Sequence, residues 1–192
     1  MNRFDKEAKN WDRVQRRVEL AKSVSGAIKP FVKESDTILE FGCGSGLVGL
    51  ELVKYAKKIV GIDTSCKMVE VFNQKAKEQQ LNAKAYCKDI FEVEEKFDKV
   101  VASMVLHHIK DIAKLEQKLY TLSNELFIAD LLKEDGSFHD RGNEGVYHFG
   151  FSKEELGSYF SDWKMDFNVI HIIKKQKEYP IFLAHLKKKV IA

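Results

Sequence analysis

The 192-residue sequence contains no apolar run that approaches the roughly 18 residues a membrane-spanning helix needs. Its first twenty residues are too charged for a secretory signal peptide. We therefore expect a cytoplasmic protein without a membrane span. Basic residues exceed acidic ones by only 32 to 29, a net charge of +3. Because nucleic-acid-binding proteins normally concentrate a larger basic excess on one face, we expect no nucleic-acid partner.

Cysteine and proline are scarce. The three cysteines, Cys43, Cys66 and Cys87, are an odd number without a Cys-x-x-Cys spacing, which argues against a disulfide framework or a zinc site. We expect Cys43 and Cys87 to be small packed side chains. The two prolines do not open an interdomain linker, and no internal repeat occurs. The length suits one domain, which we expect to cover residues 1–192.

Strand and helix patterns alternate along the chain. Apolar residues recur at helical spacing over residues 12–28, and Pro30 closes this stretch. Strands are predicted at 36–41, 57–63, 83–89, 97–105 and 124–132, and helices at 46–57, 64–80, 112–123 and 152–160. Residues 164–188 contain two β-like runs joined by a charged turn, which predicts an antiparallel pair. The alternation and this hairpin predict an α/β fold with a mostly parallel sheet.

Glycines gather in the stretch "FGCGSGLVG", between the first predicted strand and the next helix. Gly42, Gly44 and Gly46 alternate, and Gly49 follows three residues later. Such a turn lets a ligand approach the backbone closely, because no Cβ stands in the way. These glycines fit two patterns. E-x-G-x-G-x-G cradles an adenosyl amino acid, and G-x-G-x-x-G cradles a dinucleotide pyrophosphate.

Acidic residues beside the loop distinguish the two patterns. Asp63 suits both, because an acidic residue about 20 positions after the loop can hold ribose hydroxyls. G-x-G-x-x-G fits only from Gly44, whereas the alternation begins directly after the strand, at Gly42. Glu40 ends that strand, where a carboxylate would repel a pyrophosphate but attract the ammonium and sulfonium groups of S-adenosylmethionine. The residues favour S-adenosylmethionine, and an NAD(P)-binding oxidoreductase is the alternative from another enzyme class.

Four motifs resemble those of the class I S-adenosylmethionine-dependent methyltransferases, in order and in spacing. They are "ILEFGCGSG", "VGIDTSCKMVE", "KDI" and "FDKVVASMVLHHI". Within the family, the chain is most similar to small, stand-alone methyltransferases that modify metabolites, including the quinone-biosynthesis type. The resemblance implies a Rossmann-like three-layer sandwich with seven strands, the last inserted antiparallel. It also implies an N-terminal helical cover over residues 1–30, on a core of residues 36–192.

The resemblance further implies transfer of a methyl group to a small-molecule acceptor, with S-adenosylhomocysteine as product. Glu40 and the glycine loop would meet the methionine end, Asp63 the ribose, and Asp89 the adenine edge. Met68 would pack on the adenine or belong to the core, and Asp89 could instead be a turn residue. The full expected set is Trp11, Glu40, Gly42, Cys43, Gly44, Gly46, Leu47, Asp63, Thr64, Met68, Asp89, Ile90, Ser103 and Met104. Trp11 is a candidate lid residue whose alternative role is packing.

Histidine is the side chain that most often removes a proton from an acceptor. The candidate catalytic residues are His107, His139 and His148. His107 and its neighbour His108 follow the fourth predicted strand, and an alternative role for one of them is to orient the loop. A binding module that holds S-adenosylmethionine without catalysis is a third hypothesis, because binding and turnover use different residues.

Residues around the end of the fifth predicted strand could form a polar or metal-binding site. His139 and His148, with Asp130 and Asp135, are candidate ligands there. A metal site needs at least three convergent ligands, and nothing in this spacing forces convergence. We therefore expect no metal.

Overall fold

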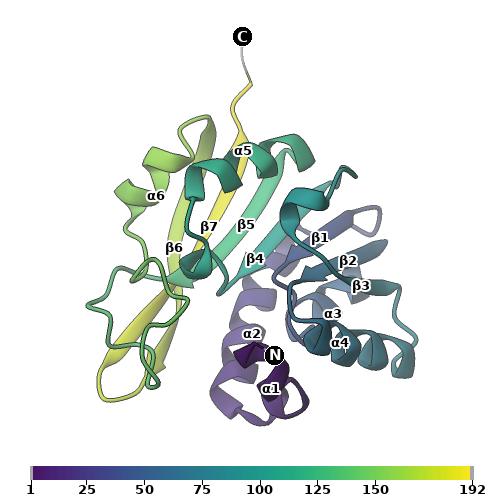
Figure 1. Cartoon of the computed structure of the whole chain (residues 1–192). Coiled ribbons are helices and arrows are strands. Elements are labelled where there is room, and N and C mark those ends of the chain that lie inside the picture. Colours follow the sequence, from purple (N-terminus) through teal and green to yellow (C-terminus); the bar gives the residue numbers. More distant parts are fainter. Residues whose placement is uncertain (1, 191–192) are drawn as a thin grey trace.

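The computed structural model describes residues 2–190, so residues 1 and 191–192 of the expected domain lie outside the described residues. The strands are β1 (Thr37–Phe41), β2 (Lys58–Asp63), β3 (Ala83–Cys87), β4 (Lys99–Ser103), β5 (Glu125–Leu131), β6 (Trp163–Lys174) and β7 (Glu178–Lys188). The α-helices are α1 (Arg3–Glu7), α2 (Gln15–Ile28), α3 (Gly49–Leu52), α4 (Cys66–Glu78), α5 (Ile112–Leu122) and α6 (Lys153–Tyr159). Short 3-10 segments are η1 (Ala8–Arg13), η2 (Lys29–Phe31), η3 (Val53–Tyr55), η4 (Ile90–Glu92) and η5 (Leu106–His108). Figure 1 shows their arrangement.

The strands form one seven-stranded sheet in the order β3-β2-β1-β4-β5-β7-β6. Neighbours from β3 to β5 are parallel, and β7 pairs antiparallel with both β5 and β6. The predicted mostly parallel sheet with an antiparallel C-terminal hairpin is confirmed. The chain order reverses between β1 and β4, and ligands of open α/β sheets bind at such a point, beyond the carboxyl ends of the strands.

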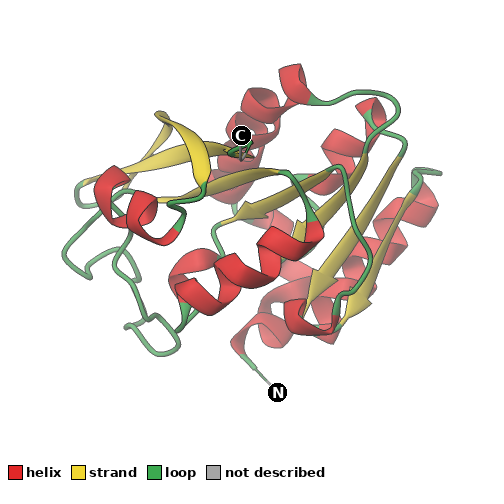
Figure 2. Ribbon diagram, turned by 90° about the horizontal axis from the view of Figure 1, so that it is seen from above, coloured by secondary structure: helices red, strands yellow, loops and turns green. Residues whose placement is uncertain are grey.

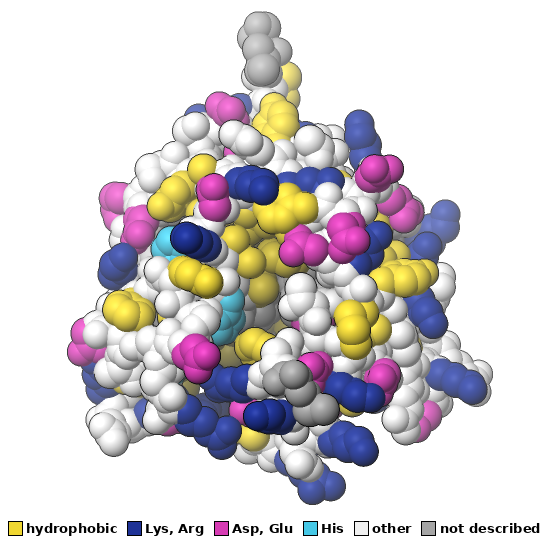
Figure 3. All heavy atoms as spheres, viewed as in Figure 1, with side chains coloured by type: hydrophobic (Ala, Val, Ile, Leu, Met, Phe, Trp, Pro, Cys, Tyr) yellow, Lys and Arg dark blue, Asp and Glu magenta, His cyan; other side chains and the backbone are white. Residues whose placement is uncertain are grey.

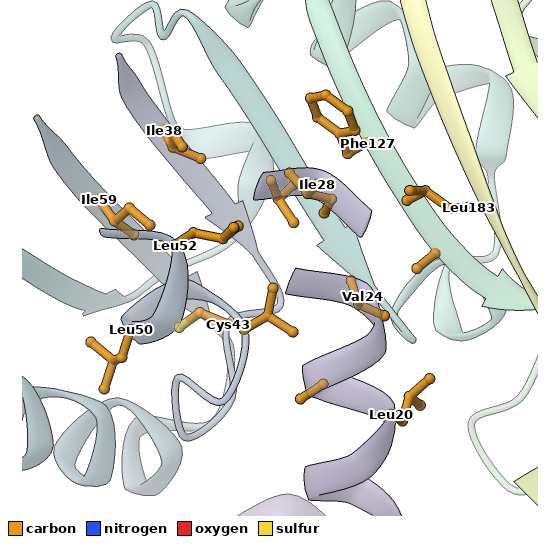
Figure 4. Packing of buried hydrophobic residues seen from close by; sticks show 14 of the residues in the cluster. Leu20, Val24, Ile28, Ile38, Cys43, Leu50, Leu52, Ile59, Phe127 and Leu183 are labelled. Atoms are coloured by element: carbon orange, nitrogen blue, oxygen red, sulfur yellow. The ribbon is translucent and has the colours of Figure 1, made fainter. Parts of the chain in front are cut away.

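Helices cover both faces of the sheet, which makes three layers (Figure 2). Strand side chains alternate between two buried clusters, because successive residues of a strand point to opposite faces. Ile38 and Ile59 pack with α2, α3 and α4 in one cluster, part of which Figure 4 shows. Leu39 and Val60 pack with α5 and α6 in the other. Near-continuous apolar strands are what a sheet buried on both faces requires.

Two predicted helices are shorter in the structure. The stripe over residues 12–28 becomes a helix only from Gln15, and α1 and η1 precede it. The helix predicted over residues 46–57 is reduced to α3 and η3, because the φ of +86° at Gly46 lies outside the helical region. Within residues 2–190, no helix has the length and apolarity to span a bilayer.

A disulfide joins Cys66, the first residue of α4, to Cys87, the last of β3, with their Cα atoms 4.9 Å apart. The expectation of no disulfide, with Cys87 as a packed side chain, is therefore wrong. In the sheet register, Cys87 lies opposite Asp63. Asp63 is three residues before Cys66 along the chain, so the two cysteines are brought close together. This tertiary neighbourhood creates the pairing, and the cysteine count could not reveal it. Cys43 is free and buried, as expected.

Candidate active site

A cavity of about 830 Å³ lies at the carboxyl ends of the parallel strands. The β1–α3 loop, the residues after β2, β3 and β4, and the N-terminal segments line it. Figure 3 shows this face hollowed, with apolar side chains inside the hollow and histidine at its edge. Of the expected residues, the cavity is lined by Trp11, Glu40, Gly42, Cys43, Gly44, Leu47, Asp63, Thr64, Met68, Asp89, Ile90, Ser103, Met104, His107 and His139.

The glycine loop divides into cavity-facing and packed positions. Gly44 has a φ of +50°, and a Cβ built on it would meet nothing within 4 Å. Gly46 does not line the cavity among the described residues. A Cβ there would stand 2.7 Å from the ring of Phe72, so Gly46 is required by packing. Its contact with a cofactor stays a prediction.

Asp63 ties the glycine loop to the start of α4. One carboxylate oxygen accepts a hydrogen bond from the Gly44 amide at 2.9 Å, and the other accepts one from the Ser65 amide at 2.8 Å. Burial raises the pKa of Asp63, and the amides of Ser65 and Gly44 oppose that shift. Each oxygen has a further lone pair, so the carboxylate can also accept hydrogen bonds from a ligand in the cavity.

Glu40 lies buried in the cavity wall with half of its carboxyl group unpaired. Its Oε1 accepts a hydrogen bond from the Gly49 amide at 3.2 Å, while Oε2 has no partner among the described residues. Burial raises the pKa of Glu40 to about 8. A Cβ on Gly49 would overlap this carboxyl group. Glycine at position 49 therefore leaves room for the carboxyl group of Glu40. The last glycine of the G-x-G-x-x-G pattern is thus explained by packing, without a pyrophosphate.

The wall after β2 and β3 carries the residues expected near an adenine. Met68 is 1% exposed, so it belongs both to the core and to the cavity lining. Asp89 caps η4 by accepting a hydrogen bond from the Phe91 amide at 2.9 Å, and it lines the cavity as well. The core role of Met68 and the turn role of Asp89 are therefore present, and their contacts with an adenine stay predictions. The Cys66–Cys87 disulfide lies beside this wall.

Met104, directly after β4, has a φ of +56°. Residues other than glycine rarely adopt this left-handed conformation, and it costs of order 1 kcal/mol. The Met104 amide donates a hydrogen bond to the Ala129 carbonyl at 2.8 Å, which fixes the turn. The backbone after Ser103 is thereby turned at the cavity wall.

Side chains of the N-terminal segment fasten it to the loop and to α4. Asp12 accepts hydrogen bonds from the Ser45 hydroxyl at 2.5 Å and from the Lys75 ammonium at 2.6 Å. Asp5 accepts one from the Ser65 hydroxyl at 2.7 Å. These contacts join positions 30 or more residues apart, so the sequence offered no signal for them. The N-terminal cover is thus anchored at the glycine loop.

Three imidazoles meet in the part of the cavity wall that follows β4. His107, His108 and His139 each offer a nitrogen, and these atoms lie within 4.8 Å of one another. Burial lowers the pKa of both His108 and His139 to about 4, and the neighbouring imidazoles add to the effect. These two rings are therefore neutral at neutral pH. The sequence makes His107 and His139 candidates without predicting that they meet, and it predicts an orienting role for either His107 or His108.

His107 is held by a buried carboxylate. Its Nδ1 lies 2.7 Å from Oδ1 of Asp130, a residue with no exposed surface. Asp130 also accepts hydrogen bonds from the backbone amides of His107 at 3.2 Å and Leu131 at 2.7 Å. His108 places its Nδ1 2.8 Å from the Gly145 carbonyl. Both oxygen partners accept, so Nδ1 donates in each ring.

His148 does not join this group. Its Nε2 lies 2.9 Å from the Ile109 carbonyl, and its ring packs against Phe151. In the part of the chain that the structure describes, His148 does not line the cavity. Its ring holds together the segments after β4 and before α6, and nothing in its position supports the prediction that it acts on the acceptor.

Comparisons with known proteins agree with this geometry. Residues 32–183 match the family model described as a methyltransferase domain. The chain belongs to this methyltransferase family. It is 34% identical over 151 residues to an uncharacterised methyltransferase of Schizosaccharomyces pombe, an alignment that covers 68% of this chain and 53% of that protein. It is 31% identical over 101 residues to a ubiquinone biosynthesis O-methyltransferase of Pelagibacter ubique, covering 50% and 42%.

The chain thus spans about half the length of these curated relatives. A solved structure titled as a DhpI–SAH complex superposes with a TM-score of 0.73 at 14% identity, covering 96% of this chain and 93% of that one. This likeness extends the shared fold over nearly the whole chain. The resemblance to class I S-adenosylmethionine-dependent methyltransferases, predicted from four motifs, is confirmed at the level of the family.

Proposed function

We propose that the protein transfers the methyl group of S-adenosylmethionine to a small-molecule acceptor and releases S-adenosylhomocysteine. The observation that carries this proposal is the unpaired Oε2 of Glu40, buried in the cavity wall beside the glycine loop. Burial keeps the carboxyl group of Glu40 largely protonated near neutral pH, and a cationic ligand beside it would favour the ionised form and offset the cost of burying that charge. A dinucleotide pyrophosphate, which is itself negatively charged, would not. Family membership independently favours the same cofactor.

The cavity residues suggest how the cofactor would be held. Glu40 and the backbone at Gly42 and Gly44 would hold the methionine end, Asp63 the ribose hydroxyls, and Met68 the adenine. The remaining proposed contacts are Trp11, Cys43, Leu47, Thr64, Asp89, Ile90, Ser103 and Met104. The cofactor supplies a methyl group on a sulfonium, which is a good leaving group. The residues' contribution is to hold the acceptor in line with that methyl group and away from water.

The acceptor would lie at the histidine end, in contact with His107 and His139. A small molecule fits better than a nucleic acid, because N-terminal residues such as Phe4 and Trp11 wall the cavity. The net charge of +3 also offers little electrostatic attraction to a polyanion.

Titration calorimetry with S-adenosylmethionine, S-adenosylhomocysteine and NADH tests the cofactor assignment. We expect both adenosyl ligands to bind and NADH to give no heat. Gly44→Ala should weaken binding, because it adds strain and a Cβ inside the cradle. Gly142→Ala is a matched control, since Gly142 also has a positive φ and open space at its Cβ but lies outside the cavity. Binding of NADH alone would overturn the assignment.

Transfer itself is tested with radiolabelled S-adenosylmethionine and pools of small metabolites, with RNA and protein fractions alongside. Label is expected in the small-molecule pool. Tight cofactor binding without any transfer would favour the non-catalytic binding module instead.

We also propose a cytoplasmic location. Because disulfides persist mainly in oxidising compartments, the Cys66–Cys87 disulfide counts against this location. Alkylation of thiols at the moment of cell lysis tests it: reduced thiols would support the cytoplasm, and an intact disulfide would contradict it.

A further inference from the structure

The histidine group at the acceptor end has the arrangement of a metal-binding site. One nitrogen from each of His107, His108 and His139 lies within 4.8 Å of the other two. The ring centroids of His107 and His108 are 4.1 Å apart, and that of His139 is 5.3 and 5.9 Å from them. Imidazole nitrogens bind zinc at about 2.0–2.1 Å, so the three rings need to move slightly closer together to share one ion.

Among the described residues, hydrogen bonds leave one nitrogen of each ring without a partner. The Nδ1 atoms of His107 and His108 donate to Asp130 and to the Gly145 carbonyl, so Nε2 of each ring keeps its lone pair. The Nδ1 of His139 is buried and has no hydrogen-bond partner among the described residues. A buried ring nitrogen without a partner costs free energy, and coordination would satisfy it.

The surroundings supply a second, independent indication. Histidines that bind metals almost always donate their other N–H to a carboxylate or a carbonyl, which fixes the ring and raises its basicity. His107 has the carboxylate of Asp130, and His108 has the carbonyl of Gly145. Within residues 2–190, the only salt-bridge partner of Asp130 is His107, with no lysine or arginine. A cation bound to the three rings would balance this fully buried charge.

We propose that His107, His108 and His139 bind one divalent transition-metal ion of the zinc class, with Asp130 as the positioning residue. This replaces the expectation from spacing that no metal is bound. All three histidines line the cavity that also contains Glu40 and Ser103, so the remaining coordination position faces the cavity. Three protein ligands with one open position are typical of catalytic rather than structural zinc sites.

The consequence for the reaction rests on the proposed methyltransferase function. A hydroxyl group of the acceptor that occupies the open position would lose its proton to water at a lower pH, because the ion stabilises the anion. Its oxygen then attacks the methyl carbon, the carbon–sulfur bond breaks, and the electron pair of that bond remains on sulfur. The site therefore points to an acceptor that carries a hydroxyl group.

Metal binding can be measured without cofactor or acceptor. Untagged protein, stripped with a chelator, is titrated with Zn²⁺ in a calorimeter and with Co²⁺ in a spectrophotometer. We expect one equivalent to bind and Co²⁺ to show the intense visible bands of a low-coordinate site. His139→Ala and His108→Ala should each weaken binding at least tenfold, and Asp130→Asn should weaken it about 10- to 100-fold. His148→Ala is the matched control, because this neighbouring ring lies outside the cluster.

Two results would overturn the site: no binding by the wild type, or equal binding by His139→Ala and His148→Ala. The role in catalysis is tested separately, by comparing methyl transfer in the stripped and reloaded protein at constant occupancy of S-adenosylmethionine. Equal rates would refute activation of the acceptor. Metal binding by a protein that never transfers a methyl group would instead refute the proposed function while leaving the site intact.

Discussion

The two ends of the cavity are built in different ways. At the cofactor end, Glu40 and Asp63 lie near the ends of the neighbouring strands β1 and β2, Gly44 follows β1, and backbone amides hold both carboxyl groups. At the acceptor end, η5 meets the long segment between β5 and α6, and side chains such as Asp130 hold the rings. The cofactor end is thus set by local backbone geometry, whereas the acceptor end is assembled by tertiary structure. Under the proposed function, the cofactor end would be compatible with many acceptors, and the acceptor end would determine which acceptor binds.

Breaking the disulfide should have the largest effect on the cofactor end. Cys66 and Cys87 are 21 residues apart, and closing a loop of that length stabilises a protein by about 3 kcal/mol in the chain-entropy model. We expect reduction to lower the free energy of unfolding by that amount, as measured by urea denaturation with and without a reductant. The Cys66→Ser/Cys87→Ser variant should match the reduced protein and not respond to the reductant. A wild type that does not respond either would mean that the two thiols are unpaired.

Asp63→Ala should weaken cofactor binding by about 1–3 kcal/mol. The substitution removes the ribose contact and leaves the Gly44 and Ser65 amides without their acceptor. Titration calorimetry measures the loss. Asp98→Ala is the control, because Asp98 also accepts a backbone amide, that of Thr37, but lies outside the cavity. Equal affinities of the two variants for S-adenosylmethionine would contradict the role of Asp63.

The effect of Glu40 on stability depends on pH. Its pKa in the folded protein is raised to about 8, so the folded state holds a proton that the unfolded state releases above its ordinary value near 4.5. Stability from this group is complete below that ordinary value and is lost as the pH rises toward 8 and past it. The loss is at most about 1.4 kcal/mol for each pH unit.

Glu40→Gln should remove this part of the pH dependence, because glutamine resembles the protonated acid in shape. Urea denaturation at pH 5 is expected to find the ligand-free variant and wild type similar, and at pH 8 to find the variant more stable. If the two stability curves stay parallel between these pH values, Glu40 is not the buried titrating group.

The sequence predicted the cofactor end far better than the acceptor end. The glycine loop, Glu40 and Asp63 occupy short segments whose order alone places them together, once parallel strands are assumed. The packing role of Gly46 could not be predicted, because a glycine needed for packing against Phe72 looks the same in sequence as one needed for a ligand.

The acceptor end was predicted only in part, for a physical reason. His107 and His139 are separated by the whole of α5 and β5, so their meeting depends on how the segment after β5 folds back. His148 lies nine residues after His139 and turns to the Ile109 carbonyl instead. Local spacing does not distinguish these two outcomes. The pairing of Cys66 with Cys87 was missed for the same reason.

Glu40 and Gly49 also constrain how this family can diverge. The carboxyl group of Glu40 lies where any side chain at position 49 would begin. Gly49→Ala alone therefore forces the carboxyl group to move, whereas a shorter residue at position 40 would make room for the change. The two positions should vary together among relatives. We expect relatives with an acidic residue at position 40 to have glycine at position 49, nine residues later.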